Sequence, residues 1–183
     1  MTDPVSCLDP VAISRPEHLV AAIAEWLAAV HSTRDHPQLP VFGVDDALSD
    51  AAALVAGDLV DPSLFEGPSN GQPATRILEV ARVLRTRLDD EPVVPIRGSI
   101  RLEDLAVRDG HIVGPSDEGV GPRALGDRYQ DLADAAAALA AHIGPGAVPA
   151  LFDRYGESPA DPIRLEVWSL LYQLRVRGRR STG

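Results

Sequence analysis

The chain has 183 residues and a formal net charge of −10, with 45% hydrophobic and 24% charged residues, and it contains no lysine. This composition is typical of one globular domain that is long enough to bury a core, and it excludes wholesale disorder. The acidic balance argues against nonspecific nucleic-acid binding and against an anionic membrane surface.

The single cysteine, Cys7, excludes an internal disulfide and a multi-cysteine metal site, as is typical of a protein in a reducing compartment. The first residues lack the basic and continuous apolar segments of a secretory signal. No stretch approaches the ~18 uninterrupted apolar residues of a membrane span. We therefore expect a cytoplasmic protein that does not enter a membrane.

Apolar periodicity, capping residues and alanine-rich runs predict a mainly helical (α+β) chain. Helices are expected over residues 15–31, 45–57, 74–88, 127–144, 146–155 and 162–176. Ser14 is expected to cap the first helix, and Asp127 and Gln130 have the spacing of a capping box. A short strand is predicted over 92–97, and residues 104–107 and 111–114 flank an Arg-Asp-Gly turn as one small β-hairpin.

These elements divide the chain into an extended lead-in over 1–14, a helical domain over 15–176 and a basic flexible tail over 177–183. The tail region holds Arg175, Arg177, Arg179 and Arg180. Such an end can touch phosphate or an acidic partner, although it is more often a solvated terminus.

Short motifs follow one another in a fixed order between residues 97 and 131. They are Arg97-Gly98-Ser99, Asp104, Arg108-Asp109-Gly110, Ser116-Asp117-Glu118-Gly119 and Asp127-Arg128-Tyr129-Gln130-Asp131. This order resembles the C-terminal lobe of the aminoglycoside phosphotransferases, most closely the 3′-phosphotransferase branch, and the resemblance extends over about residues 10–175. It implies a protein-kinase-like fold in which the N-terminal lobe is expected to be absent.

Two catalytic residues of the family have no counterpart in this sequence. A phosphotransferase of this kind uses a lysine on the nucleotide phosphates and an aspartate beside the acceptor hydroxyl. The chain has no lysine, and Ser99 stands where the family has its catalytic aspartate, while Arg97 replaces a histidine. A serine hydroxyl is not ionised near neutral pH and cannot replace a carboxylate as the base.

Two aspartates match the nucleotide and metal positions of the family: Asp104 replaces the metal-binding asparagine, and Asp117 matches the metal-binding aspartate. Without phosphate oxygens they give Mg²⁺ too few ligands for tight binding, so the alternative is a pair of solvated loop carboxylates. We expect no bound cofactor, and Mg²⁺ and ATP enter only if the chain is an enzyme. Asp127 and Asp131 are expected to be structural, the first as a helix cap and the second as an acceptor for backbone N–H groups of the 97–99 loop.

The positions that match the family's aminoglycoside-binding site are not acidic in this sequence. The family binds cationic aminoglycosides with carboxylates at the end of the long helix and near the carboxyl terminus. The matched positions here are Ala141, His142, Gln173 and Arg175. This change weakens binding of a cationic ligand.

Three functions remain as alternatives. The leading hypothesis is a noncatalytic pseudokinase that binds a protein partner, or a second copy of itself, through the face left open by the missing lobe. The alternative is an ATP-dependent small-molecule phosphotransferase whose N-terminal lobe comes from another chain. Association with nucleic acid through the arginine-rich end is the weakest hypothesis, because the net charge opposes it.

Overall fold

The computed structural model describes residues 4–34, 38–113, 121–157 and 159–179, and every structural statement below concerns these residues. The helices are α1 (Pro10–Ile13), α2 (Pro16–His31), α3 (Val44–Ala56), α4 (Ala74–Arg85), α5 (Arg128–His142), α6 (Ala147–Tyr155) and α7 (Pro162–Tyr172). Short 3₁₀ turns lie at Pro62–Leu64, Gly67–Ser69 and Leu102–Asp104, the last called η3, and a π-helical turn, η4 (Gln173–Arg177), follows α7. The expectation of a mainly helical chain is confirmed.

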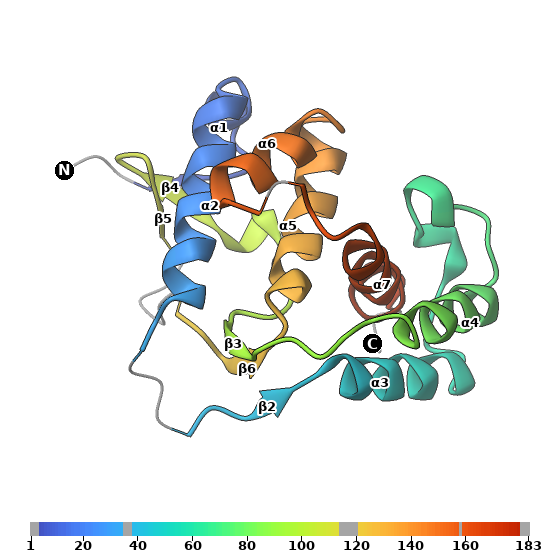
Figure 1. Ribbon diagram of the computed structural model, residues 1–183. Helices are drawn as coiled ribbons and strands as arrows, with labels where there is room; N and C mark the ends of the chain where they lie inside the picture. The colour runs from blue at the N-terminus through green and yellow to red at the C-terminus, as the bar shows by residue number, and fades with distance from the viewer. Residues whose placement is uncertain (1–3, 35–37, 114–120, 158, 180–183) are drawn as a thin grey trace.

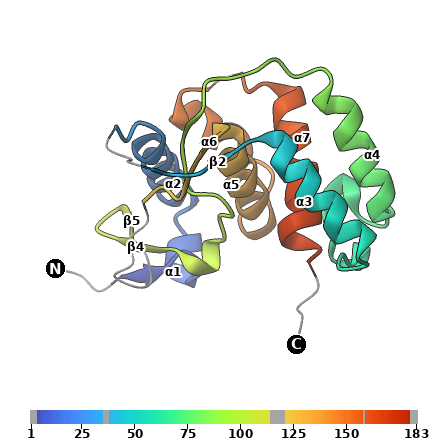
Figure 2. The same cartoon turned by 90° about the horizontal axis from the view of Figure 1, so that it is seen from below.

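Helix α5 lies at the centre of the molecule. Helices α2 and α6 pack together on one side of it, and α7 packs on the other side, followed by α3 and α4 (Figure 1, Figure 2). Ten residues of α5 are buried, and four of them are alanines. Small side chains allow neighbouring helices to approach closely, so an alanine-rich helix suits this central place. No helix in the described part is both long and apolar enough to cross a bilayer.

The strands form two three-stranded sheets, whereas one hairpin and one separate strand over 92–97 were expected. One sheet has the antiparallel order β1 (Val5–Ser6), β4 (Ala106–Arg108) and β5 (His111–Val113), which includes the predicted hairpin. The other has the order β2 (Val41–Phe42), β6 (Ala124–Gly126) and β3 (Val94–Ile96), with β2 parallel and β3 antiparallel to β6. Strands of two or three residues are too short to display an alternating pattern, which explains the missed sheet.

The central strand β6 is closely packed at Gly126. A Cβ atom there would lie 2.6 Å from both the Ile96 Cδ1 and the Phe42 carbonyl oxygen. Only glycine therefore allows β2 and β3 to pair with β6 at this point.

Both ends of the described chain are more ordered than expected. In the lead-in, Cys7 N–H donates to the Leu105 carbonyl (3.0 Å), and the segment forms the strand β1 and the helix α1, so the lead-in is not extended throughout. At the other end, Asp61 N–H donates to the Gly178 carbonyl (2.7 Å), and Arg179 forms a β-bridge with Val60. Residues 178 and 179 therefore make backbone contacts with the segment around Val60.

The predicted helix boundaries needed small corrections. Helix α2 follows Arg15, which makes no side-chain capping bond, so Ser14 is not the cap. Helix α4 ends three residues early, because Leu88 N–H bonds the carbonyl of Arg85 three positions back instead of four.

Candidate functional site

The loop that follows β3 occupies the place of the predicted catalytic motif. Gly98 (φ 64°) and Ser99 (φ 54°) are both in the left-handed region, and Ser99 is exposed. This conformation costs a serine about 1–2 kcal/mol, so contacts elsewhere must hold the loop in shape.

Two buried carboxylates of α5 provide those contacts. Asp131 accepts hydrogen bonds from the backbone N–H of Arg97 (Oδ2, 2.6 Å) and of Gly98 (Oδ1, 2.7 Å). Asp134, one turn later, accepts from the N–H of Ile100 (3.1 Å). Asp131 therefore makes the kind of backbone contact expected of it, whereas the part played by Asp134 was missed.

Asp131 also belongs to a side-chain network that the sequence did not reveal. Its Oδ2 lies 3.1 Å from His31 Nε2, and His31 Nδ1 lies 2.7 Å from the Tyr155 hydroxyl. Both His31 and Asp131 are buried. The last turn of α2 is thereby tied to α5 and α6 through polar groups.

Burial raises the pKa of the Asp134 carboxyl well above its ordinary value, and the nearby charge of Asp131 adds to this shift. Hydrogen bonds from the Ile100 and Ser99 backbone and the charge of Arg175 act in the opposite direction. A proton on Asp134 avoids placing a second negative charge in the interior. The available signal in the sequence was a charged residue on a helix face that is otherwise apolar.

Asp127 joins α5 to α7. Its Oδ1 accepts from Tyr129 N–H (2.8 Å), while its Oδ2 accepts from the buried Arg164 guanidinium (Nη1, 2.7 Å) and from the Trp168 indole (3.0 Å). Gln130 does not complete the expected capping box, because its Oε1 is buried without a hydrogen-bond partner in the described chain. The carboxylate of Asp127 thus makes structural contacts on two helices.

Of the two predicted metal ligands, only Asp104 lies in the described part of the chain. Asp104 lies exposed at the end of η3, and Asp117 lies outside the described residues. No cluster of three or more His, Cys, Asp or Glu side chains in the described part could hold a metal. Asp104 therefore has no second and third ligand for a magnesium ion among the described residues.

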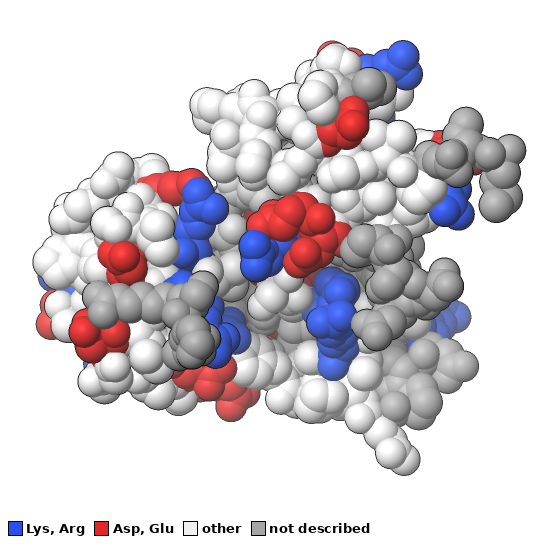
Figure 3. All heavy atoms as spheres, turned by 180° about the vertical axis from the view of Figure 1, so that it is seen from behind, with Lys and Arg blue, Asp and Glu red and all other residues white. Residues whose placement is uncertain are grey.

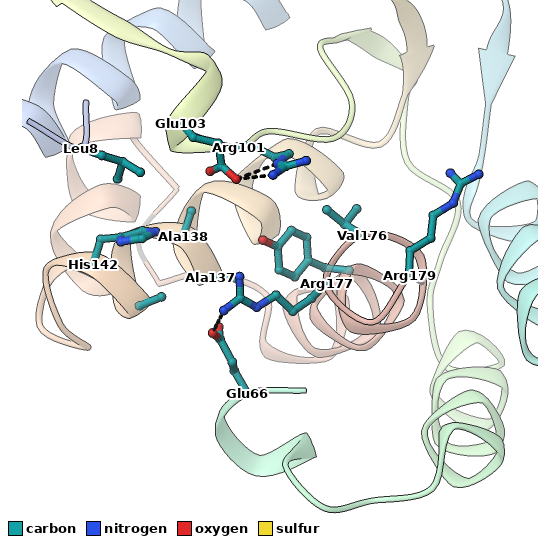
Figure 4. Close-up of a pocket in the computed structure, with 12 residues that line it drawn as sticks. Leu8, Glu66, Arg101, Glu103, Ala137, Ala138, His142, Val176, Arg177 and Arg179 are labelled. Carbon is teal, nitrogen blue, oxygen red and sulfur yellow. Dashed lines mark hydrogen bonds and ion pairs between the residues drawn. The ribbon is translucent and has the colours of Figure 1, made fainter. Parts of the chain in front are cut away.

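A pocket of about 350 Å³, here called the Tyr172 pocket, opens between η3, the end of α5 and η4 (Figure 4). Its charged lining includes Arg101, Glu103, Glu66, Arg177 and Arg179. Arg101 pairs with Glu103 on one wall, and Arg177 pairs with Glu66 on the opposite wall (Figure 4). Ala141 and His142, two of the positions matched to the acceptor site, also line this pocket.

A second pocket, of about 370 Å³, contains Ser99 and is called the Ser99 pocket. Arg175 and Arg179 line it together with Asp50. Arg175 lies 3.6 Å from Asp50 and over the ring of Phe42, 4.7 Å from its centroid. Burial lowers the pKa of Arg175. On the face opposite to that of Figure 1, basic side chains likewise lie next to acidic ones (Figure 3).

Comparison with known proteins gives matches at the level of structure. No protein-family model matches the chain, and no curated protein matches it. An aminoglycoside-3′-phosphotransferase of type VIII superposes with a TM-score of 0.72 at 22% identity, covering 88% of this chain and 62% of that one. The aminoglycoside phosphotransferase APH(3″)-Id from Streptomyces rimosus superposes with a TM-score of 0.68 at 19% identity, covering 94% of this chain and 66% of that one.

The same Streptomyces rimosus enzyme in complex with ADP and streptomycin gives a TM-score of 0.69 at 19% identity, with 94% of this chain and 67% of that one covered. The chain thus spans about two thirds of the length of these structures. Identities this low establish the fold and not the activity. The resemblance inferred from the sequence is confirmed at that level: the chain has the kinase-like fold of the aminoglycoside phosphotransferases.

Proposed function

We propose that this protein is a noncatalytic member of the phosphotransferase-like fold that acts by binding. The observation that carries the proposal is Ser99, an exposed hydroxyl at the loop position where the related enzymes need an aspartate. A neutral hydroxyl cannot take the proton of an incoming alcohol near neutral pH.

The carboxylates around this loop support the proposal, because none is suited to replace the missing base. Asp131 and Asp134 are buried behind the backbone of the loop and accept its N–H groups. Asp50 lines the Ser99 pocket, but it is paired with Arg175. The chain also has no lysine to hold nucleotide phosphates.

The partner we propose is a protein or a second copy of the chain. Support comes from two exposed valines at opposite edges of the β2-β6-β3 sheet: Val41 is 63% exposed and Val93, beside β3, is 52% exposed. Exposed apolar groups near strand edges favour association. We place this function in the cytoplasm, which suits a free, buried Cys7.

The proposal is tested by measuring ATP-dependent phosphorylation of aminoglycosides. The purified chain is incubated with Mg²⁺, ATP and a panel of aminoglycosides, and product is measured by mass spectrometry. We expect no ATP-dependent product. A saturable product that is lost in Ser99→Ala would overturn the proposal, because the serine would then take part in the chemistry.

The second candidate is a phosphotransferase that works with another chain. It is favoured by the fold shared with an enzyme solved with ADP and streptomycin, two thirds of whose length this chain spans. Positioning and electrostatics alone supply much of the rate in phosphoryl transfer, so a partner could in principle restore slow activity. Activity that appears only when a copurified chain is present would favour this candidate over the first.

A further inference from the structure

We propose that the Tyr172 pocket binds a small organic anion, a carboxylate or a phosphate monoester, between Arg101 and Arg177. This inference rests on the proposed binding function and names the chemical class of its ligand. A volume of about 350 Å³ falls within the range of small-molecule sites, which is roughly 300–1,000 Å³.

The charge of the pocket is opposite to that of the whole chain. Three arginines line it against two glutamates, whereas the sequence as a whole carries a net charge of −10. Arg179 also lines the Ser99 pocket, and its side chain points away from the space between the two ion pairs (Figure 4). Arg101 and Arg177, on opposite walls, are the guanidinium groups that an anion in this space would meet.

The two ion pairs leave the arginines available. Arg101 and Glu103 are 54% and 43% exposed, and Arg177 and Glu66 are 46% and 37% exposed. Exposed pairs of this kind are individually weak, so a ligand carboxylate or phosphate can replace the glutamate without a large loss. A guanidinium binds either anion through two parallel hydrogen bonds.

Tyr172 supplies a neutral donor at the base of the site. The residue is 8% exposed and lines the pocket, and its hydroxyl makes no hydrogen bond to a described residue. Burial raises the pKa of its hydroxyl to about 12, while the neighbouring charge of Arg177 acts in the opposite direction. The phenol therefore keeps its proton at neutral pH and can donate a hydrogen bond to an anion.

A polycation is a poor fit for the same pocket. Its two lining glutamates each already have an arginine partner, so among the described residues no unpaired carboxylate lines the pocket to bind a cation. Ala141 and His142 offer no further carboxylate at the end of α5. The pocket thus differs in charge preference from one built for aminoglycosides.

The experiment is a titration of the full chain with citrate, glucose 6-phosphate and spermidine at constant ionic strength, followed by calorimetry. The citrate and glucose 6-phosphate arms distinguish a carboxylate ligand from a phosphate ligand. We expect at least one anion to bind and spermidine to give no saturable signal. Saturable spermidine binding without anion binding, or no binding of either anion, would overturn the inference.

Two variants on the same wall have opposite expected effects. Arg177→Gln should weaken anion binding about tenfold, whereas Glu66→Gln, which frees Arg177, should tighten it severalfold.

Tyr172→Phe should weaken binding by a smaller factor of roughly three to ten. Arg82→Gln, at an exposed arginine of α4 away from this pocket, is the control and should leave binding unchanged. Equal affinity in Arg177→Gln and Glu66→Gln would also contradict the proposed site.

The anion-binding inference and the noncatalytic proposal can be refuted independently of each other. Absence of anion binding together with absence of ATP turnover removes only this inference. ATP-dependent product formation removes the noncatalytic proposal, whatever the anions do.

Discussion

The Asp131 carboxylate accepts the backbone N–H of Arg97 at 2.6 Å, so a fully buried acid of α5 fixes the first residue of the loop that presents Ser99. The same carboxylate also holds Gly98 and His31. The shape of the loop therefore depends on a side chain behind it and not on the residue it presents.

Replacing Asp131 with alanine should cost roughly 3–5 kcal/mol of unfolding free energy, because it leaves two backbone N–H groups and a histidine nitrogen buried without their acceptor. Urea denaturation measures the change. Asp153→Ala on the exposed face of α6 is the matched control and should change stability by less than about 0.5 kcal/mol. Equal losses for the two variants would contradict the structural part assigned to Asp131.

Asp134 predicts a dependence of stability on pH. Because its pKa is raised in the folded protein, the folded chain retains a proton that the unfolded chain loses above about pH 4, so the contribution of this group falls as pH rises from there toward its folded pKa. Asp134→Asn lacks this titration. The melting temperature of Asp134→Asn minus that of the wild type should therefore increase between pH 5 and pH 8. A difference that stays constant or decreases would show that the carboxyl is ionised throughout.

Asp127 and Asp161 both cap helices, but only Asp127 also accepts from Trp168 and lies 2.7 Å from buried Arg164. Asp161→Ala should cost about 1 kcal/mol, the usual loss of an N-cap. Asp127→Ala should cost roughly 3 kcal/mol or more, because it also leaves a buried guanidinium without its closest carboxylate. Chemical denaturation of both variants tests the order, and a smaller loss for Asp127→Ala would contradict it.

Placing an aspartate at position 99 should not produce phosphotransferase activity. Aspartate tolerates the left-handed backbone at position 99 (φ 54°), so Ser99→Asp is expected to fold. The chain still has no lysine to bind nucleotide phosphates, and we expect no ATP-dependent phosphorylation of aminoglycosides. A circular dichroism melt confirms folding of the variant. A labelled product formed from γ-labelled ATP would refute the prediction.

Cys7 should be chemically silent in the folded protein. Burial raises the pKa of its thiol to about 11, so at pH 8 only on the order of one molecule in a thousand carries the reactive thiolate. A chromogenic disulfide reagent should react slowly with native protein and with one thiol per chain in denaturant. Rapid native reaction would mean that the segment around β1 opens readily.

The long helices could be predicted from the sequence, whereas the sheets mostly could not. Helix α2 presents its apolar residues at helical spacing over sixteen residues, which gives a strong signal. Strands β1 and β2 have two residues each, and their partners lie far along the chain, with Val5 opposite Val107 and Val41 opposite Leu125. Such pairings depend on tertiary packing and leave no local pattern.

The candidate site divides in the same way. The contact of Asp131 with the loop was expected from the resemblance of residues 97–131 to the phosphotransferase motifs. The contact between His31 and Asp131 joins residues 100 positions apart, and no spacing rule predicts it. A polar partner for Asp134 could have been predicted from the sequence, since an acid within a buried run of alanines must be hydrogen-bonded.

The acids at the start of α5 face inward, toward backbone amides, a histidine and a guanidinium, and Ser99 faces outward. Selection for a folded chain consequently acts on one set of positions and selection for chemistry on another. Residue 99 can therefore change without disturbing the contacts that hold the loop in shape.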